Sequence, residues 1–222
     1  MESFINAVEK TAGILLSLLK YTGITVQLTL SGILIGIVLG LILAMGRLSK
    51  NSFFQKLSWF YIWVFRGTPL LMQLFFIYYA LPLYSKYLQF PATAAGIIAL
   101  GLNSGAYLAE IIRAAILSID KGQMEASKAL GMTYGQAMRR IIIPQSYRRL
   151  IPPVGNEAIM LLKDSALVSS IAITELLRRT NQIMNNSGSP SIFIYSAAIY
   201  LFLTTILTVI FQKLEEKYSV YE

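Results

Sequence analysis

Long apolar runs constrain the fold of this chain more than any other feature of its sequence. A helix needs roughly 20 mostly apolar residues to cross the hydrocarbon core of a bilayer. Five segments meet or approach that requirement: 22–46, 59–82, 91–117, 152–177 and 191–214. Composition agrees, because 55% of the residues are hydrophobic and only 14% are charged, whereas about a quarter are charged in a typical soluble domain. We predict an all-α integral membrane protein with about five transmembrane helices.

The ends of this arrangement are less regular. Residues 1–21 carry too many polar groups for a span and are predicted to form a separate interfacial helix. They lack the basic start and small-residue cleavage site of a signal peptide. The segment 152–177 is the most polar of the five spans. The sequence contains neither repeats nor a soluble insertion, so we predict one transmembrane domain over residues 1–222.

The distribution of basic residues predicts the topology. Eleven of the 19 lysines and arginines fall in 47–56, 118–151 and the C-terminal end, five fall on the opposite side, and three lie in or beside spans. Cytoplasmic segments are enriched in lysine and arginine. The N-terminus is therefore predicted outside the cell membrane and the C-terminus inside it. This bias explains most of the net charge of +8 without a nucleic-acid partner.

A polar segment interrupts the apolar runs at 118–151 and includes EASKALGMTYGQAMRRIIIPQ, residues 125–145. Ala126, Ala129 and Leu130 would share one helical face, and Gly131 suits a helix end or tight turn. A second helix is predicted to end before Pro144. Two short helices joined at Gly131 would form a compact cytoplasmic knob. The alternative is an amphipathic linker that lies on the inner membrane surface.

The same segment matches a longer pattern, E-A-A, three residues, G, nine residues, I-x-L-P. The matching residues are Glu125, Ala126, Ser127, Gly131, Ile141, Ile143 and Pro144. Ser127 stands for an alanine of the pattern and Ile143 for a leucine. The segment resembles the EAA loop of ABC importer permeases, and its flanks resemble the polar amino-acid uptake branch of that family. The resemblance covers about residues 20 to 215.

This resemblance implies a type I ABC importer permease-like fold in which residues 118–151 form a coupling loop. Such a loop seats on a dimer of cytoplasmic ATPase subunits. The other implied partners are a second permease copy or homologue and an extracytoplasmic amino-acid-binding protein that meets loops near 83–90 and 178–190. This chain lacks the G-x-x-x-x-G-K-[ST] phosphate cradle. ATP and magnesium would therefore be bound by the partner ATPase, and no cofactor is expected in this chain.

Polar groups inside spans are costly and are by default functional candidates. The candidate substrate-binding residues are Gly67, Thr68, Asn103, Ser104, Tyr107, Glu110, Asn156, Glu157, Met160 and Asp164. Asn103, Tyr107 and Glu110 share one helical stripe, and Glu157 and Asp164 are two turns apart on another. The alternatives are an ion pair of Glu110 with Arg113, and polar contacts of the two other acids that only stabilise the bundle.

Two glycine-containing patterns complete the candidate helix contacts. In RGTP, residues 66–69, Pro69 interrupts the helix and would leave backbone groups free for a substrate, or would only kink the packing. Gly32, Gly36 and Gly40 have the spacing of a close helix–helix contact, which we expect on the bundle periphery.

The function predicted from these features is an ATP-driven amino-acid importer whose membrane subunit forms the pathway. Acidic residues beside a broken helix favour a basic amino acid such as arginine, with glutamine or glutamate next. The alternative is a gradient-driven carrier or channel that needs no ATPase. An enzyme is disfavoured because the chain has no histidine and no cysteine, and no metal site is expected.

Overall fold

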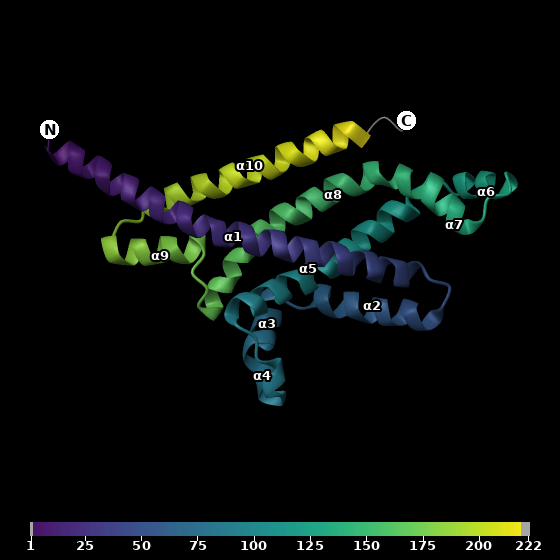
Figure 1. Ribbon diagram of the computed structural model, residues 1–222, viewed down its shortest axis with the longest axis horizontal. Coiled ribbons are helices and arrows are strands. Elements are labelled where there is room, and N and C mark those ends of the chain that lie inside the picture. The colour runs from purple at the N-terminus through teal and green to yellow at the C-terminus, as the bar shows by residue number, and fades with distance from the viewer. Residues whose placement is uncertain (1, 219–222) are drawn as a thin grey trace.

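The computed structural model describes residues 2–218, and throughout that part of the chain the regular structure is helical. Three long helices dominate Figure 1: α1 (Glu2–Leu48), α5 (Ala92–Leu117) and α10 (Ile192–Tyr218). α8 (Ile143–Asp164) runs between them and has a more polar sequence than they do. The predicted all-α membrane fold is confirmed by this architecture.

By length and apolarity, three helices of the described residues can cross a membrane: Thr11–Leu48, Ala92–Leu117 and Ile192–Tyr218. The pair Ser52–Gly67 and Leu70–Tyr84 passes the same test when it is counted as one broken span. α8 is not apolar enough to be counted as a span, because charged residues and prolines lie along it.

The separate interfacial helix predicted at 1–21 does not occur within the described residues, because α1 is continuous from Glu2 to Leu48. No proline interrupts residues 2–48, and a Cβ at Gly13 or Gly23 would meet nothing within 4 Å. Isolated glycines are tolerated in a helix at a cost of about 1 kcal/mol. The helix therefore continues from its apolar stretch back through the more polar turns at its N-terminal end.

The second predicted span, 59–82, is two helices that meet at a sharp bend. α2 (Ser52–Gly67) ends at Thr68, and α3 (Leu70–Phe75) begins after Pro69. α3 continues through a π-helical turn (Phe76–Ala80) into α4 (Leu81–Tyr84), and a 3-10 turn (Lys86–Leu88) follows. The two halves are bent by 105°, so α3 and α4 turn away from the bundle in Figure 1.

The polar segment folds as α6 (Lys121–Ala129) and α7 (Tyr134–Ala137), which project at one end of the molecule in Figure 1. α7 does not end before Pro144. It runs through a π-helical turn (Met138–Ile142) into α8, with Pro144 in the first turn of α8. The π-helical turn directly before Pro144 already interrupts the regular α-helical hydrogen bonds, so the missing amide hydrogen of the proline is tolerated there.

The predicted span 152–177 is also displaced. α8 begins nine residues earlier and ends at Asp164, with Pro152 and Pro153 inside it. A 3-10 helix (Ser165–Ile171) follows, and Ala172 then takes a left-handed conformation with φ 70°. α9 (Leu176–Ser187) starts after Glu175, whose carboxylate accepts from the amides of Leu177 and Arg178 at 2.8 and 2.7 Å.

The core centres on the contact between α1 and α5, which is closed by glycines on both helices. A Cβ at Gly36 would lie 2.8 Å from Ser104 Oγ, and one at Gly40 would lie 2.8 Å from Leu108 Cβ. In return, a Cβ at Gly101 would lie 2.6 Å from Ile35 and one at Gly105 2.8 Å from Leu39. The glycine row of α1 therefore faces α5, and its expected position on the periphery is wrong.

Candidate functional site: a cavity at the helix break and an exposed knob

A cavity of about 650 Å³ opens where α2 breaks, between that break, α5 and α8. Residues on all three elements line it: Arg66, Gly67, Thr68, Pro69, Leu70, Asn103, Tyr107, Ile111, Pro153, Asn156, Glu157, Met160 and Asp164. The wall combines one guanidinium, two carboxylates, amides and apolar surface. Such a mixture of a few polar groups on an apolar lining is typical of small-molecule sites.

Eight of the ten candidate substrate residues line this cavity: Gly67, Thr68, Asn103, Tyr107, Asn156, Glu157, Met160 and Asp164. Ser104 does not. It is fully buried and faces Gly36 of α1 instead, because it lies on the α1 side of α5. Glu110 lines two neighbouring hollows nearer the end of α5.

The break itself is held by side-chain hydrogen bonds that replace the missing helical ones. Gln73 Nε2 lies 2.9 Å from the Phe65 carbonyl, 3.0 Å from the Thr68 carbonyl and 2.9 Å from Thr68 Oγ1. Asn103 Nδ2 donates to Gln73 Oε1 at 3.0 Å and to the Phe65 carbonyl at 3.2 Å. These side chains satisfy carbonyls that the end of α2 leaves free. Asn103 therefore braces the cavity wall as well as lining it.

Sequence reasoning missed two residues of this site, Gln73 and Arg66. Gln73 is buried in an apolar run four residues after Pro69, and a lone amide at that spacing is the signal that would have found it. Arg66 lies beside the break, with its guanidinium 5.2 Å from the centre of the Tyr107 ring. Its position directly before Gly67 was the available clue.

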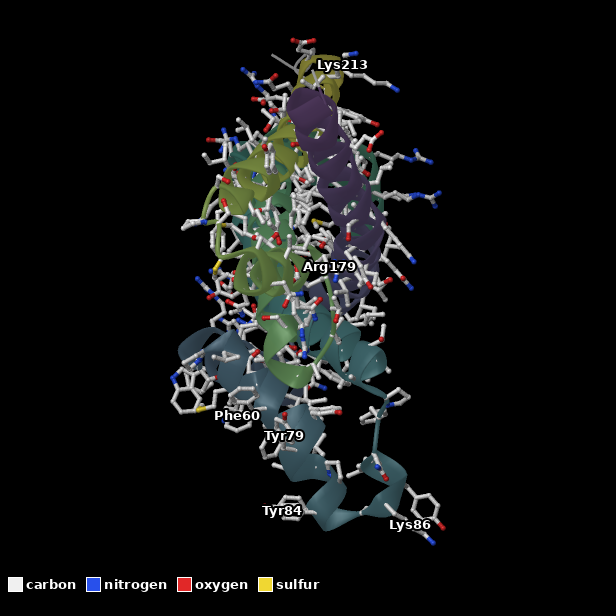
Figure 2. The ribbon with its side chains drawn as sticks, turned by 90° about the vertical axis from the view of Figure 1, so that its left-hand side faces the viewer. Phe60, Tyr79, Tyr84, Lys86, Arg179 and Lys213 are labelled. Atoms are coloured by element: carbon white, nitrogen blue, oxygen red, sulfur yellow. The ribbon has the colours of Figure 1, made fainter. Side chains whose placement is uncertain are left out.

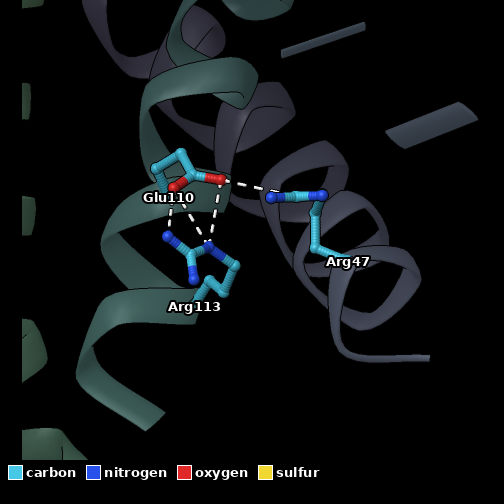
Figure 3. A network of polar contacts seen from close by, with 3 residues as sticks. All are labelled: Arg47, Glu110 and Arg113. Atoms are coloured by element: carbon cyan, nitrogen blue, oxygen red, sulfur yellow. Dashed lines mark hydrogen bonds and ion pairs between the residues drawn. The ribbon is translucent and has the colours of Figure 1, made fainter. Parts of the chain in front are cut away.

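Glu110 is engaged in an ion-pair network near the end of α5 (Figure 3). Arg113 Nε donates to the two carboxylate oxygens at 3.1 and 3.0 Å, and Arg113 Nη2 donates to Oε2 at 2.7 Å. Arg47, in the last turn of α1, lies 3.7 Å away on the other side. The predicted pairing with Arg113 is therefore present in the structure, with Arg47 as a second partner.

The knob formed by α6 and α7 is shaped by local hydrogen bonds. Asp120 caps α6 by accepting from the Gly122 amide at 2.7 Å. At its end, the Met132 amide donates to the Ser127 carbonyl and the Gly131 amide to the Lys128 carbonyl, with Gly131 at φ 80°. This is a Schellman motif, which requires a left-handed residue at the position of Gly131.

The second half of the knob is capped and tied back to the bundle. Thr133 and Gln136 exchange hydrogen bonds in a capping box, with distances of 3.3 and 2.9 Å. Gln145 Nε2 donates to Gln123 Oε1 at 3.2 Å, which links α8 to α6. Arg149 also donates to the Ser118 carbonyl. The knob is therefore a structured element with fixed attachment points.

The predicted coupling residues divide between the surface and the interior of the knob. Glu125, Ala126 and Gly131 are exposed, and the neighbouring Leu130 is 83% exposed. Ile141 and Pro144 are half-buried against the rest of the chain. Ser127 is buried and donates to the Gln123 carbonyl at 2.6 Å, so it faces inward and not toward a partner.

Together, a helical membrane domain, a cavity at a broken helix and an exposed polar knob define a membrane permease subunit. The chain belongs to the family described as binding-protein-dependent transport system inner membrane component, which matches residues 36–220. Members of this family are membrane components of transport systems, so the chain is not an enzyme.

Several proteins of known role resemble the chain. An arginine transport system permease protein of Corynebacterium glutamicum is 41% identical over 198 residues, covering 83% of this chain and 63% of that protein's length. A second arginine transport system permease protein, from Bacillus subtilis, is 39% identical and covers 90% of this chain and 91% of its own. A chain in the crystal structure of an amino acid ABC transporter with histidines superimposes with a TM-score of 0.86 at 38% identity, covering 96% of this chain and 98% of that one.

Proposed function

We propose that this chain forms half of the pathway of an ATP-driven importer for a basic amino acid such as arginine. The observation that carries the proposal is the cavity at the helix break, where Arg66, Glu157 and Asp164 line one space. With both acids ionised, these three side chains sum to one negative charge. A basic amino acid at neutral pH carries one positive charge, so its transfer into the cavity would leave no net charge in the membrane.

The arrangement of the lining residues suggests how such a substrate would bind. Arg66 offers a guanidinium to the substrate carboxylate, a pairing whose fork geometry favours two hydrogen bonds. Leu70, the first residue of α3, lines the same wall, and amides at a helix start have no intrahelical acceptor. Glu157 and Asp164, on α8, would hold the ammonium group and the cationic side chain. The arginine transport role of the two relatives supports this substrate class.

The cavity wall is incomplete in a single chain, which favours a second subunit. Tyr107 is 37% and Met160 54% exposed although both line the cavity. A second copy or a homologue would close this side. The exposed surface of Glu125, Ala126, Leu130 and Gly131 would dock on one subunit of an ATPase dimer, which would bind ATP and magnesium. An extracytoplasmic amino-acid-binding protein would dock at the opposite end.

The proposed orientation places the knob in the cytoplasm. In Figure 1 the turn after α1, the knob and the C-terminal end of α10 lie toward the right, whereas the N-terminus and α9 lie toward the left. These right-hand elements contain the three segments that are rich in lysine and arginine, namely 47–56, 118–151 and the C-terminal end. The positive-inside tendency therefore supports a cytoplasmic C-terminus and an external N-terminus.

Reconstituted uptake tests the substrate proposal. The chain would be co-purified with the ATPase and binding protein of its transport system and placed in liposomes. Glu157→Gln and Asp164→Asn are each expected to lower uptake of radiolabelled arginine at least about tenfold, because each removes a carboxylate that would pair with the cationic substrate. Glu215→Gln, an exposed acid near the C-terminus, is the matched control. Equal arginine uptake by the cavity variants and the control would refute the assignment.

The knob separates an ATP-driven importer from a gradient-driven carrier. Glu125→Lys reverses the exposed charge, and Gly131→Pro removes the left-handed turn and the amide that donates to Lys128. Both changes are expected to abolish ATPase binding and ATP-dependent uptake, as measured by co-purification and transport. Gly135→Ala is the control, because a Cβ there would meet nothing within 4 Å. Uptake that persists without any ATPase would instead establish the carrier.

A further inference from the structure

A second hollow lies outside the proposed substrate cavity, at the junction of α1, α2 and α5. Its volume is about 340 Å³, and its wall includes Arg47, Trp59, Trp63, Arg66 and Glu110. Arg47 stands four residues before Asn51, which caps α2, so the hollow lies near the turn between the two helices. That turn is at the same end of the molecule as the knob (Figure 1). Arg66 and Gly67 line both this hollow and the proposed substrate cavity, so the two spaces share one wall.

The hollow has an excess of positive charge. Both oxygens of Glu110 already accept hydrogen bonds from Arg113. Arg47 is held only by a contact of 3.7 Å to the same carboxylate, and its Nε has no hydrogen-bond partner among the described residues. Arg66 lies over the Tyr107 ring and forms no salt bridge within residues 2–218. Arg47 and Arg113 therefore share one carboxylate. This leaves one positive charge in excess at the hollow, apart from the charge of Arg66, which is already counted in the substrate cavity.

The wall opposite these charges is aromatic and open to the side. The Trp59 and Trp63 rings stack at 6.0 Å with an angle of 10° between them, and they are 49% and 60% exposed. Phe60, between them, is 55% exposed and points away from the bundle in Figure 2. Trp59 lies about 10 Å along the helix from Ser52, at 1.5 Å per residue. Tryptophan is enriched at the depth where lipid headgroups meet acyl chains.

We propose that this hollow binds an anionic phospholipid from the leaflet on the knob side of the membrane. The phosphate would accept hydrogen bonds from Arg47, and an acyl chain would lie along the Trp59 and Trp63 rings. Basic pockets between transmembrane helices are suited to such headgroups. A free anion of the same charge could satisfy Arg47 but would leave the aromatic wall uncovered. The combination of charge and apolar surface favours the lipid.

The chain offers a built-in probe, because Trp59 and Trp63 are its only two tryptophans. Brominated acyl chains quench tryptophan fluorescence on contact. The full-length chain, purified in detergent, would be titrated with brominated phosphatidylglycerol and separately with brominated phosphatidylcholine. Phosphatidylglycerol is expected to quench at a lower mole fraction, by a factor of about five, because one arginine contacts the phosphate.

Three variants test the residues. Arg47→Gln is expected to remove the preference for the anionic lipid, whereas Arg47→Lys retains most of it. Arg139→Gln removes an exposed positive charge from the knob end of the chain and is expected to change nothing. Monodisperse elution and unchanged helical circular dichroism establish that each variant is folded.

The other outcomes would overturn the proposal. Equal quenching by the two lipids would show that only the apolar wall binds. A preference that Arg47→Gln leaves intact would place the anionic lipid elsewhere. If neither lipid quenches and dilution into excess detergent restores quenching, a second copy of the chain covers the tryptophans. Quenching lost on addition of inorganic phosphate alone would identify a free-anion site.

Discussion

The contact between α1 and α5 and the break between α2 and α3 both bring backbones close, but by opposite means. At the first, glycines on each helix admit side chains of the other at Gly36, Gly40, Gly101 and Gly105. At the second, Gln73 and Asn103 hold three backbone or hydroxyl acceptors around a bend. One contact is defined by shape and the other by polar partners.

This difference bears on which part of the chain can move. Closely packed helices cannot slide gradually past each other, because a shift of one helix forces its side chains into the backbone of the other. Hydrogen bonds around a break can exchange partners, including a substrate or water, at smaller cost. We therefore expect α1 and α5 to move as one body and the cavity wall at Thr68 to be the adjustable element. Substitutions on each side distinguish these two kinds of contact.

The largest effect is expected for Gly40→Leu. Even a Cβ at this position would lie 2.8 Å from Leu108 Cβ and 3.1 Å from the Ala109 backbone nitrogen, and the nitrogen cannot move aside as a side chain can. Overpacking typically costs about 1–3 kcal/mol and occasionally more, and a clash with backbone belongs at the upper end. We expect little folded protein, measured as the yield of monodisperse material and the midpoint of thermal unfolding in detergent.

Gly23→Leu is the control on the same helix, because a Cβ there would meet nothing within 4 Å. It is expected to unfold at or slightly above the temperature of the parent, since leucine favours helix more than glycine does. If both variants fold normally, the α1–α5 contact is not the rigid part of the molecule and the comparison fails.

An intermediate effect is expected at the break. Gln73→Leu leaves the carbonyls of Phe65 and Thr68 without their side-chain donor, at a cost of about 1–3 kcal/mol. Arginine uptake should fall by more than the loss of folded protein accounts for, because the cavity wall loses its shape. Gln89→Leu, at an exposed position after the 3-10 turn, is the control.

A double-mutant cycle sharpens this test. Gln73 and Asn103 contact each other at 3.0 Å, so Gln73→Leu and Asn103→Leu should be non-additive by about 0.5–3 kcal/mol. Additive losses would mean that the two amides act independently and that the break has no shared brace.

The knob was predictable from sequence because its interactions are local. Gly131 and the residues it contacts lie within five positions of one another, and Asp120 and Thr133 cap helices that start beside them. Ser127 shows the limit of this reasoning. Its match to the EAA pattern made it a candidate coupling residue, but which way it faces depends on how α6 packs against the π-helical turn and α8.

The cavity was predictable only in part, because it joins helices that are distant in sequence. Helical spacing placed Asn103 and Tyr107 on one face correctly, but it could not show that the adjacent Ser104 turns toward α1. From the sequence, Arg66 was placed in or beside a span and was not made a site residue. Nothing in one sequence reveals the 105° bend that brings this side chain into the cavity wall.

The smallest effect is expected for Tyr61→Phe, which tests how α2 is attached to α5 just before the break. Tyr61 OH donates to the Leu102 carbonyl at 2.8 Å, one residue before Asn103. Its loss should cost about 1 kcal/mol, because the ring stays in place and one neutral hydrogen bond is removed. Thermal unfolding would be compared with Tyr84→Phe, whose ring is 79% exposed. If Tyr61→Phe destabilises more than Gln73→Leu, the attachment of α2 and not the brace around Thr68 holds the cavity wall, and the adjustable element lies about two turns earlier than proposed.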